Sequence, residues 1–221
     1  MESNEEFFNW LKEHNASFDS IDIKKITLYD RGIVSCGVIA SGTPLLCIPK
    51  DLIITPELGK ATPIGQKIIQ AGITLHWDHL FFITLFLLTE KHNKKSIWKP
   101  YLNMYPATVN SFPLFYTNSE KELLKATSML DYIDKEFKER KEEYERIIKI
   151  VPEFEEFSFD EYVKCRVIVT SRVFHTNIHG VPSYLIVPLA GFFYVIKGKI
   201  CLIILRIVRQ HGSIQIQMKH S

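Results

Sequence analysis

The chain has 221 residues, and its 27 basic and 25 acidic side chains leave a formal net charge of +2. Hydrophobic residues make up 46% of it, which excludes a disordered chain and is typical of a globular protein. No dense basic patch stands out, so a nucleic-acid partner is not expected. The four cysteines form no Cys-x-x-Cys pair and match no zinc site. We therefore expect free thiols, no metal ion and an intracellular location, cytoplasmic or nuclear.

The first third of the chain predicts a helix, then strands, then helices. Residues 6–15 place Phe7, Trp10 and Leu11 on one helical face, and Asn15 is the expected stop. Residues 22–55 carry short β-branched runs between Gly and Pro breaks, which predicts three or four strands. Residues 58–92 predict helices, the stretch 74–90 being apolar nearly all round and hence buried.

The middle of the chain predicts an aromatic loop and two further helices. Residues 96–116 are rich in proline and aromatic side chains, which indicates a packed loop. Two capping-box patterns, Ser119 with Glu122 and Ser158 with Glu161, predict the starts of helices over 119–150 and from 158 to about Phe174. A polar turn over 175–182 and a strand over 183–188 are expected to follow.

The last segment has two interpretations. Residues 185–208 have the length of a membrane span, but Lys197 and Lys199 lie near the centre. Each charge there costs about 2.5–3.5 kcal/mol on insertion scales. A membrane is therefore not the expected partner, and a membrane-anchored protein stays as an alternative.

The common nucleotide and hydrolase motifs are absent: the sequence has no P-loop, no Rossmann glycine pattern, no H-E-x-x-H and no G-x-S-x-G. The pairs His76–His79 and His175–His179 lack a third ligand at an informative spacing. We expect these histidines to be packed or solvated rather than to bind metal.

Four segments in order carry the informative pattern. They are the strand pair from Tyr29 to Pro49, Trp98-Lys99-Pro100-Tyr101-Leu102 with Tyr105-Pro106, the charged helical block ending at Tyr162, and Val169–Phe174 leading to Leu185–Ala190. Together they resemble the SET-domain protein methyltransferases of the Rubisco large-subunit and actin-histidine methyltransferase type. The resemblance covers residues ~5–190, about 85% of the chain.

The resemblance implies an α+β fold. A SET-type, β-rich core over 1–190 would be interrupted by a large α-helical insertion at about 58–175. Residues 191–221 would form a divergent hydrophobic and basic tail, with the C-terminal part of the core missing or altered.

The resemblance also implies S-adenosylmethionine as cofactor and a lysine or histidine of a protein substrate as methyl acceptor. We further expect a monomer. Arg31, Gly32, Ile33 and Val34 match the first turn that lies against the cofactor. A glycine lets backbone approach a ligand closely. Arg172 matches the arginine that closes on the methionine end, where its fork suits a carboxylate. Phe174 would line the acceptor channel, although a core role suits it equally.

The chain departs from the family pattern at defined positions. Asp30 replaces the first glycine of the turn, and the positions expected for the cofactor-gripping Asn-His pair read Tyr194-Val195. No counterpart of the later tyrosine segment, which orients the acceptor nitrogen, is present. We therefore assign no catalytic residue. We also keep two alternatives to an active enzyme: a catalytically dead SET-like module that binds protein, and the membrane-anchored form.

Overall fold

The computed structural model describes residues 2–26, 31–40, 43–106, 108–178, 181–192, 202–208 and 213–219. The chain divides into two compact units. Unit 1 combines residues 1–54 with 172–221, and unit 2 comprises residues 55–171. Segments far apart in the sequence therefore build unit 1, whereas unit 2 is one continuous insertion.

Unit 1 contains one α-helix, short strands and two 3₁₀ turns among its described residues. Its elements are α1 (Glu2–Glu13), β1 (Ile21–Lys25), β2 (Arg31–Ser35), β3 (Pro44–Pro49), η1 (Lys50–Leu52), β4 (Phe174–Ile178), β5 (Val181–Leu185), η4 (Ala190–Phe192), β6 (Leu202–Val208) and β7 (Ser213–Lys219).

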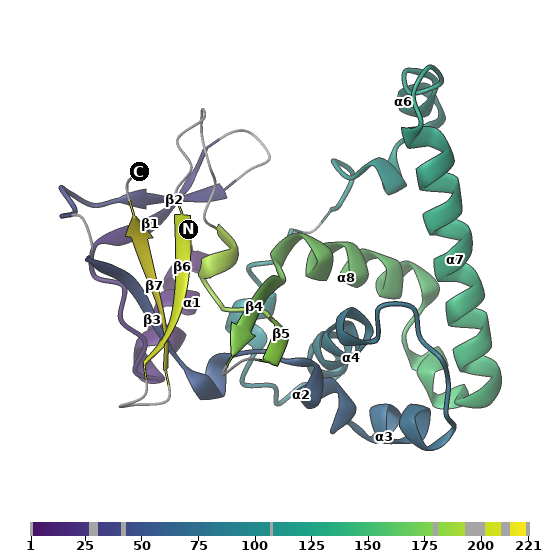
Figure 1. Ribbon diagram of the computed structural model, residues 1–221, viewed down its shortest axis with the longest axis horizontal. Coiled ribbons are helices and arrows are strands. Elements are labelled where there is room, and N and C mark those ends of the chain that lie inside the picture. The colour runs from purple at the N-terminus through teal and green to yellow at the C-terminus, as the bar shows by residue number, and fades with distance from the viewer. Residues whose placement is uncertain are drawn as a thin grey trace. The chain divides into compact units, whose positions relative to one another are not determined.

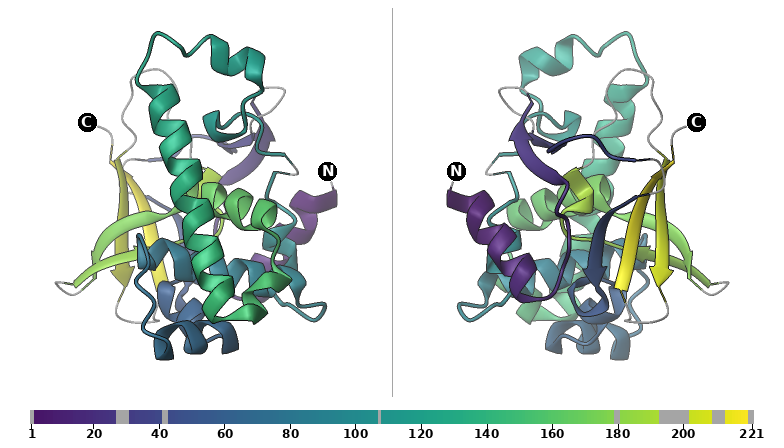
Figure 2. Two further views of the ribbon diagram at one scale, coloured as in Figure 1. Left: turned by 90° about the vertical axis from the view of Figure 1, so that its right-hand side faces the viewer. Right: turned by 90° about the vertical axis from the view of Figure 1, so that its left-hand side faces the viewer.

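The strands of unit 1 form three small antiparallel sheets. β1 pairs with β2, β4 pairs with β5, and β7 lies between β3 and β6 (Figures 1 and 2). An isolated bridge also joins Ile54 to Ile186, with backbone hydrogen bonds of 3.0 and 2.8 Å. The segments that precede and follow the insertion in the sequence thereby form one β-rich unit.

Helix α1 confirms the first predicted helix and its stop. Phe7, Trp10 and Leu11 are all buried, as one apolar face requires. The helix ends at Glu13, and Asn15 adopts a left-handed conformation with φ of 62°. Asparagine tolerates this conformation better than most residues, which is why it can end a helix.

Unit 2 is helical in all its described elements. These are α2 (Pro56–Lys60), α3 (Pro63–Gln70), α4 (Asp78–His92), α5 (Lys99–Leu102), η2 (Pro113–Phe115), α6 (Asn118–Glu122), α7 (Met129–Ile150), η3 (Pro152–Glu156) and α8 (Phe159–Arg172). The long helix α7 runs beside α8 in Figures 1 and 2.

An aromatic cluster forms the core of unit 2. Phe154 is fully buried, and its ring lies 5.6–5.8 Å from those of Phe81, Tyr144, Phe157 and Tyr162. Pairs at these separations add to the stabilisation that comes from burying the rings. Four elements, α4, α7, η3 and α8, therefore meet at one residue.

Two predicted helix starts need correction. The capping box of α6 uses Thr117 and Glu120, not Ser119 and Glu122, because Thr117 has the extended backbone that a cap requires. The apolar helix begins at Asp78 and not at residue 74, because Trp77 is left-handed with φ of 57°. The predicted cap at Ser158 is confirmed, with the Glu161 N–H donating to Ser158 Oγ at 3.3 Å.

The segment after α8 also differs from the prediction. α8 ends at Arg172, and Phe174 lies in strand β4 instead of the helix. The predicted polar turn over 175–182 is mostly the hairpin of β4 and β5. Residues 202–208 form strand β6. Of the helices that the structure describes, none is long and apolar enough to cross a membrane.

Candidate cofactor site in unit 1

The predicted glycine lies in a strand. Gly32 is the second residue of β2, is buried, and pairs with Lys24 of β1. Arg31, Ile33 and Val34 share the strand and are half-buried. The glycine is thus part of a sheet edge and not the turn itself, and residues 27–30 lie outside the described part of the chain.

Arg172 is the last residue of α8, and the 3₁₀ turn η4 packs against its stem. A Cβ added to Gly191 would lie only 3.1 Å from Cγ of Arg172. This spacing is tighter than ordinary van der Waals contact, so the absence of a side chain at Gly191 lets Arg172 lie close to η4. Gly191 therefore helps to position the guanidinium.

One aromatic ring brings the two predicted arginines together. The guanidinium carbon of Arg31 lies 6.0 Å from the ring centroid of Phe192, and that of Arg172 lies 5.8 Å from it. Phe192 is only 5% exposed, and its ring also lies 6.3 Å from that of Phe7. Cations at this distance from an aromatic face are attracted to it. Within unit 1, strand β2 and Arg172 thus meet at the η4 ring.

The site places two cationic side chains beside one ring. Burial lowers the pKa of Arg31 from its usual value, and the charge of Arg172 lowers it further. Burial disfavours the charged form of Arg31, and the coulombic effect is repulsion between the two guanidinium groups. A carboxylate bound between them would remove this repulsion and accept charge-assisted hydrogen bonds. The donor set therefore suits the amino-acid end of a ligand.

The remaining predicted positions have separate outcomes. Phe174 pairs with Leu185 in the β4–β5 hairpin, and among the described residues no ring contact joins it to Phe192. The Tyr194-Val195 positions lie outside the described residues. The sequence analysis did not identify Phe192 as a site residue, because Gly191-Phe192 lies where the chain departs from the family pattern. A glycine directly before an aromatic residue was the feature of the sequence that could have drawn attention to it.

A cavity in unit 2

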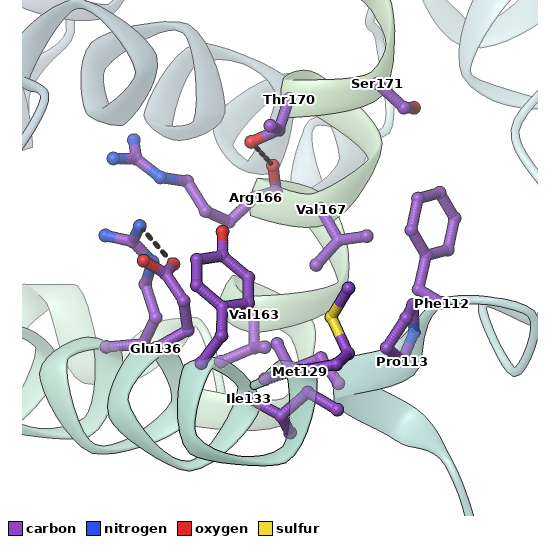
Figure 3. A pocket seen from close by; sticks show the side chains of 13 residues that line it. Phe112, Pro113, Met129, Ile133, Glu136, Val163, Arg166, Val167, Thr170 and Ser171 are labelled. Atoms are coloured by element: carbon purple, nitrogen blue, oxygen red, sulfur yellow. Dashed lines mark hydrogen bonds and ion pairs between the residues drawn. The ribbon is translucent and has the colours of Figure 1, made fainter. Parts of the chain in front are cut away.

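A second candidate is an apolar cavity of about 220 Å³ between α7, α8 and η2. Figure 3 shows Met129 of α7 and Val167 of α8 pointing toward one another, with Phe112 and Pro113 at the same end. Glu136 and Arg140 pair at 2.9 Å on its other side. Because the lining is largely apolar and this ion pair is already formed, the cavity presents no evident reacting group.

A buried polar network lies next to this cavity. Glu143 accepts hydrogen bonds from the Tyr162 hydroxyl at 2.5 Å and from the His76 N–H at 3.0 Å. Arg166, 2% exposed, donates from Nη2 to the carbonyls of His76 and Trp77 at 3.0 and 3.3 Å. Burial, together with Glu143, raises the pKa of Tyr162. The network thus holds the left-handed Trp77 turn that starts α4, which is a structural role.

Comparison with known proteins

No protein-family model matches the chain. A lysine N-methyltransferase of chloroplast fructose-bisphosphate aldolase from Arabidopsis thaliana is 28% identical over 83% of this chain and 38% of its own length. Actin-histidine N-methyltransferases from Xenopus tropicalis and Homo sapiens are 24% and 20% identical over 71% of this chain and 28% of their length. The chain thus spans less than half the length of these curated relatives.

Solved structures show a similar fold over nearly the whole chain. The SET domain of the large-subunit methyltransferase LSMT bound to lysine and AdoHcy superposes with a TM-score of 0.82, at 18% identity, over 98% of this chain and 50% of that one. Rubisco LSMT bound to AdoMet superposes with a TM-score of 0.78 over 99% of this chain. The predicted α+β class with a helical insertion is confirmed, and the chain has the fold of the SET domain of these methyltransferases.

Proposed function

We propose that the chain belongs to an S-adenosylmethionine-dependent methyltransferase that acts on a lysine or histidine side chain of a protein. The relatives carry out such reactions on aldolase and actin, according to their names. The observation that carries the proposal is the convergence of Arg31 and Arg172 on Phe192 within a SET fold.

The residues of unit 1 fit one part of the cofactor. Arg172 and Arg31 would bind its carboxylate, and the backbone of Gly32, between Ile33 and Arg31, would lie against it without a side chain in the way. Val34 continues the same strand, and Phe174 would line the acceptor side. When bound, S-adenosylmethionine supplies a methyl group on a sulfonium, and positioning of the neutral acceptor nitrogen provides much of the rate.

Isothermal calorimetry with S-adenosylmethionine on the full chain tests this proposal. Arg172→Ala should weaken binding by about 10- to 100-fold, because hydrogen bonds to charged groups contribute about 1.5–3 kcal/mol. Arg146→Ala is the matched control, since Arg146 is exposed in unit 2, where it donates to the Thr74 carbonyl at 2.9 Å. Absence of any heat of binding to the unmodified chain would contradict the proposal.

A second candidate function is a SET-like module that no longer transfers methyl groups. The positions expected for the cofactor-gripping Asn-His pair read Tyr194-Val195, and no counterpart of the tyrosine segment that orients the acceptor nitrogen is found. Transfer of labelled methyl to cell proteins separates the two candidates. Cofactor binding without any protein labelling would support the module.

A further inference from the structure

A groove of about 520 Å³ lies within unit 2, apart from the cavity in Figure 3. Its lining comes from the C-terminal half of α4, from α5 and residues 103–106, from Val109, and from α8. We refer to five of its apolar lining residues as the floor: Leu87, Leu88, Leu102, Val109 and Ile168. An apolar floor of this size favours an occupant with apolar side chains.

Some of the lysines that line the groove form ion pairs with neighbouring carboxylates, and others do not. Lys91 donates to Glu161 at 2.9 Å, and Lys164 donates to Asp160 at 2.6 Å. Glu90 accepts a hydrogen bond from the Ser96 hydroxyl. Two further lining residues, Lys94 and Lys99, have no acidic partner among the described residues. The four lysines and three carboxylates of the lining thus leave the groove a net charge of +1.

The sequence around these lysines strengthens the asymmetry. Residues 91–99 contain Lys91, Lys94, Lys95 and Lys99 and no acidic residue. In the same segment Ile97 is 58% exposed. A basic segment with an exposed aliphatic side chain next to an apolar groove complements an acidic partner that carries apolar groups.

We propose that this groove binds an acidic, extended segment of a protein partner. An apolar side chain of that segment would enter the floor between Leu102 and Ile168. Its carboxylates would lie against Lys94 and Lys99. The groove lies wholly within unit 2, and Arg31 and Arg172 belong to unit 1, so this binding does not depend on the proposed methyl transfer.

Fluorescence polarisation with the full chain tests the proposal. The probe is a fluorescein-labelled acidic decapeptide that carries two leucines; matched peptides replace its aspartates with lysines, or its leucines with serines. The acidic leucine peptide should bind most tightly, and its affinity should fall as salt is raised. Lys94→Glu with Lys99→Glu should weaken it on the order of tenfold, because each exposed charge pair contributes about 0.2–1 kcal/mol.

The control variant is Lys121→Glu with Lys149→Glu, which makes the same charge change at residues that do not line the groove. It should leave the affinity within about twofold. Leu102→Asp tests the floor separately and should also weaken the acidic peptide. Equal binding of the basic peptide, or equal loss in the control variant, would overturn the proposal. Concentration-dependent dimers that compete with the peptide would overturn it in favour of a second copy as occupant.

Discussion

Arg31 and Arg172, separated by most of the chain, flank one buried ring: their guanidinium carbons lie 6.0 and 5.8 Å from the centroid of Phe192. Two like charges near each other are costly unless an anion or an aromatic face compensates them. The pair therefore places two positive charges next to Phe192 in unit 1. It also makes the ligand's carboxylate, and not its adenosine, the group that these arginines should recognise.

Neutralising Arg31 should weaken carboxylate recognition selectively. Arg31→Gln removes one of the two charges, so affinity for S-adenosylmethionine should fall about 3- to 10-fold, close to 1 kcal/mol. Affinity for 5′-methylthioadenosine, which lacks the carboxylate, should stay unchanged. Calorimetry with both ligands measures the difference. An equal loss for both would show that Arg31 supports the fold of β2 instead of binding the carboxylate.

Breaking the buried network of unit 2 should destabilise the protein strongly. Glu143→Gln removes the buried carboxylate that accepts from Tyr162 and lies 3.7 Å from Arg140, although Arg140 keeps Glu136; loss of a buried charge partner costs about 3–5 kcal/mol in comparable sites. Glu142→Gln, at an exposed position with a Lys138 pair of 3.9 Å, should change stability by less than about 0.5 kcal/mol. Urea unfolding, followed by circular dichroism, compares the two variants. Equal midpoints would refute the role of Glu143.

The contribution of the aromatic core of unit 2 to stability can be tested by comparing a buried phenylalanine, Phe154, with an exposed one, Phe137. Phe154→Ala empties the centre of the ring cluster and should lower the free energy of unfolding by about 3–5 kcal/mol. Phe137 is 44% exposed and has one edge contact with Phe159 at 5.5 Å, so Phe137→Ala should cost about 1 kcal/mol or less. Thermal denaturation should rank the two in this order.

Cys165 should be chemically inert at neutral pH. Burial raises the pKa of its thiol to about 12, so the thiolate that reacts with alkylating agents is scarce. Cys36 is exposed and should be alkylated by iodoacetamide at pH 8 much faster, as peptide mass spectrometry would show. Rapid labelling of Cys165 in the folded chain would contradict this expectation.

The raised pKa of Cys165 also determines how the free energy of unfolding should change with pH. The thiol of Cys165 has an ordinary pKa of about 8.5 when unfolded and about 12 when folded. The unfolded chain therefore loses this proton first, and the stabilising effect of the neutral thiol is complete below pH 8.5 and is lost between pH 8.5 and 12. Cys165→Ala should flatten that alkaline decline in chemical denaturation. A variant with the original slope would exclude Cys165 as its source.

Local sequence patterns determined much of the fold. The 3.6-residue stripe of Phe7, Trp10 and Leu11, and the cap at Ser158, specify their helices because side-chain periodicity and backbone hydrogen bonds are local properties. The order of four weak motifs pointed to the SET fold, and the superposition confirms it. Helix boundaries were less predictable, as the left-handed Trp77 shows, because buried Arg166 and Glu143 from distant helices hold that turn.

The sequence by itself predicted which segments are helices and strands, and it identified two arginines as candidate cofactor-binding residues. Only the tertiary structure decided that Arg31 and Arg172 meet, that the ring between them is Phe192, and that Lys94 and Lys99 border a groove. The reason is physical. Periodicity and capping act within a few residues, whereas the position of a charge relative to a distant ring follows from how strands and helices pack, and that packing depends on the whole chain.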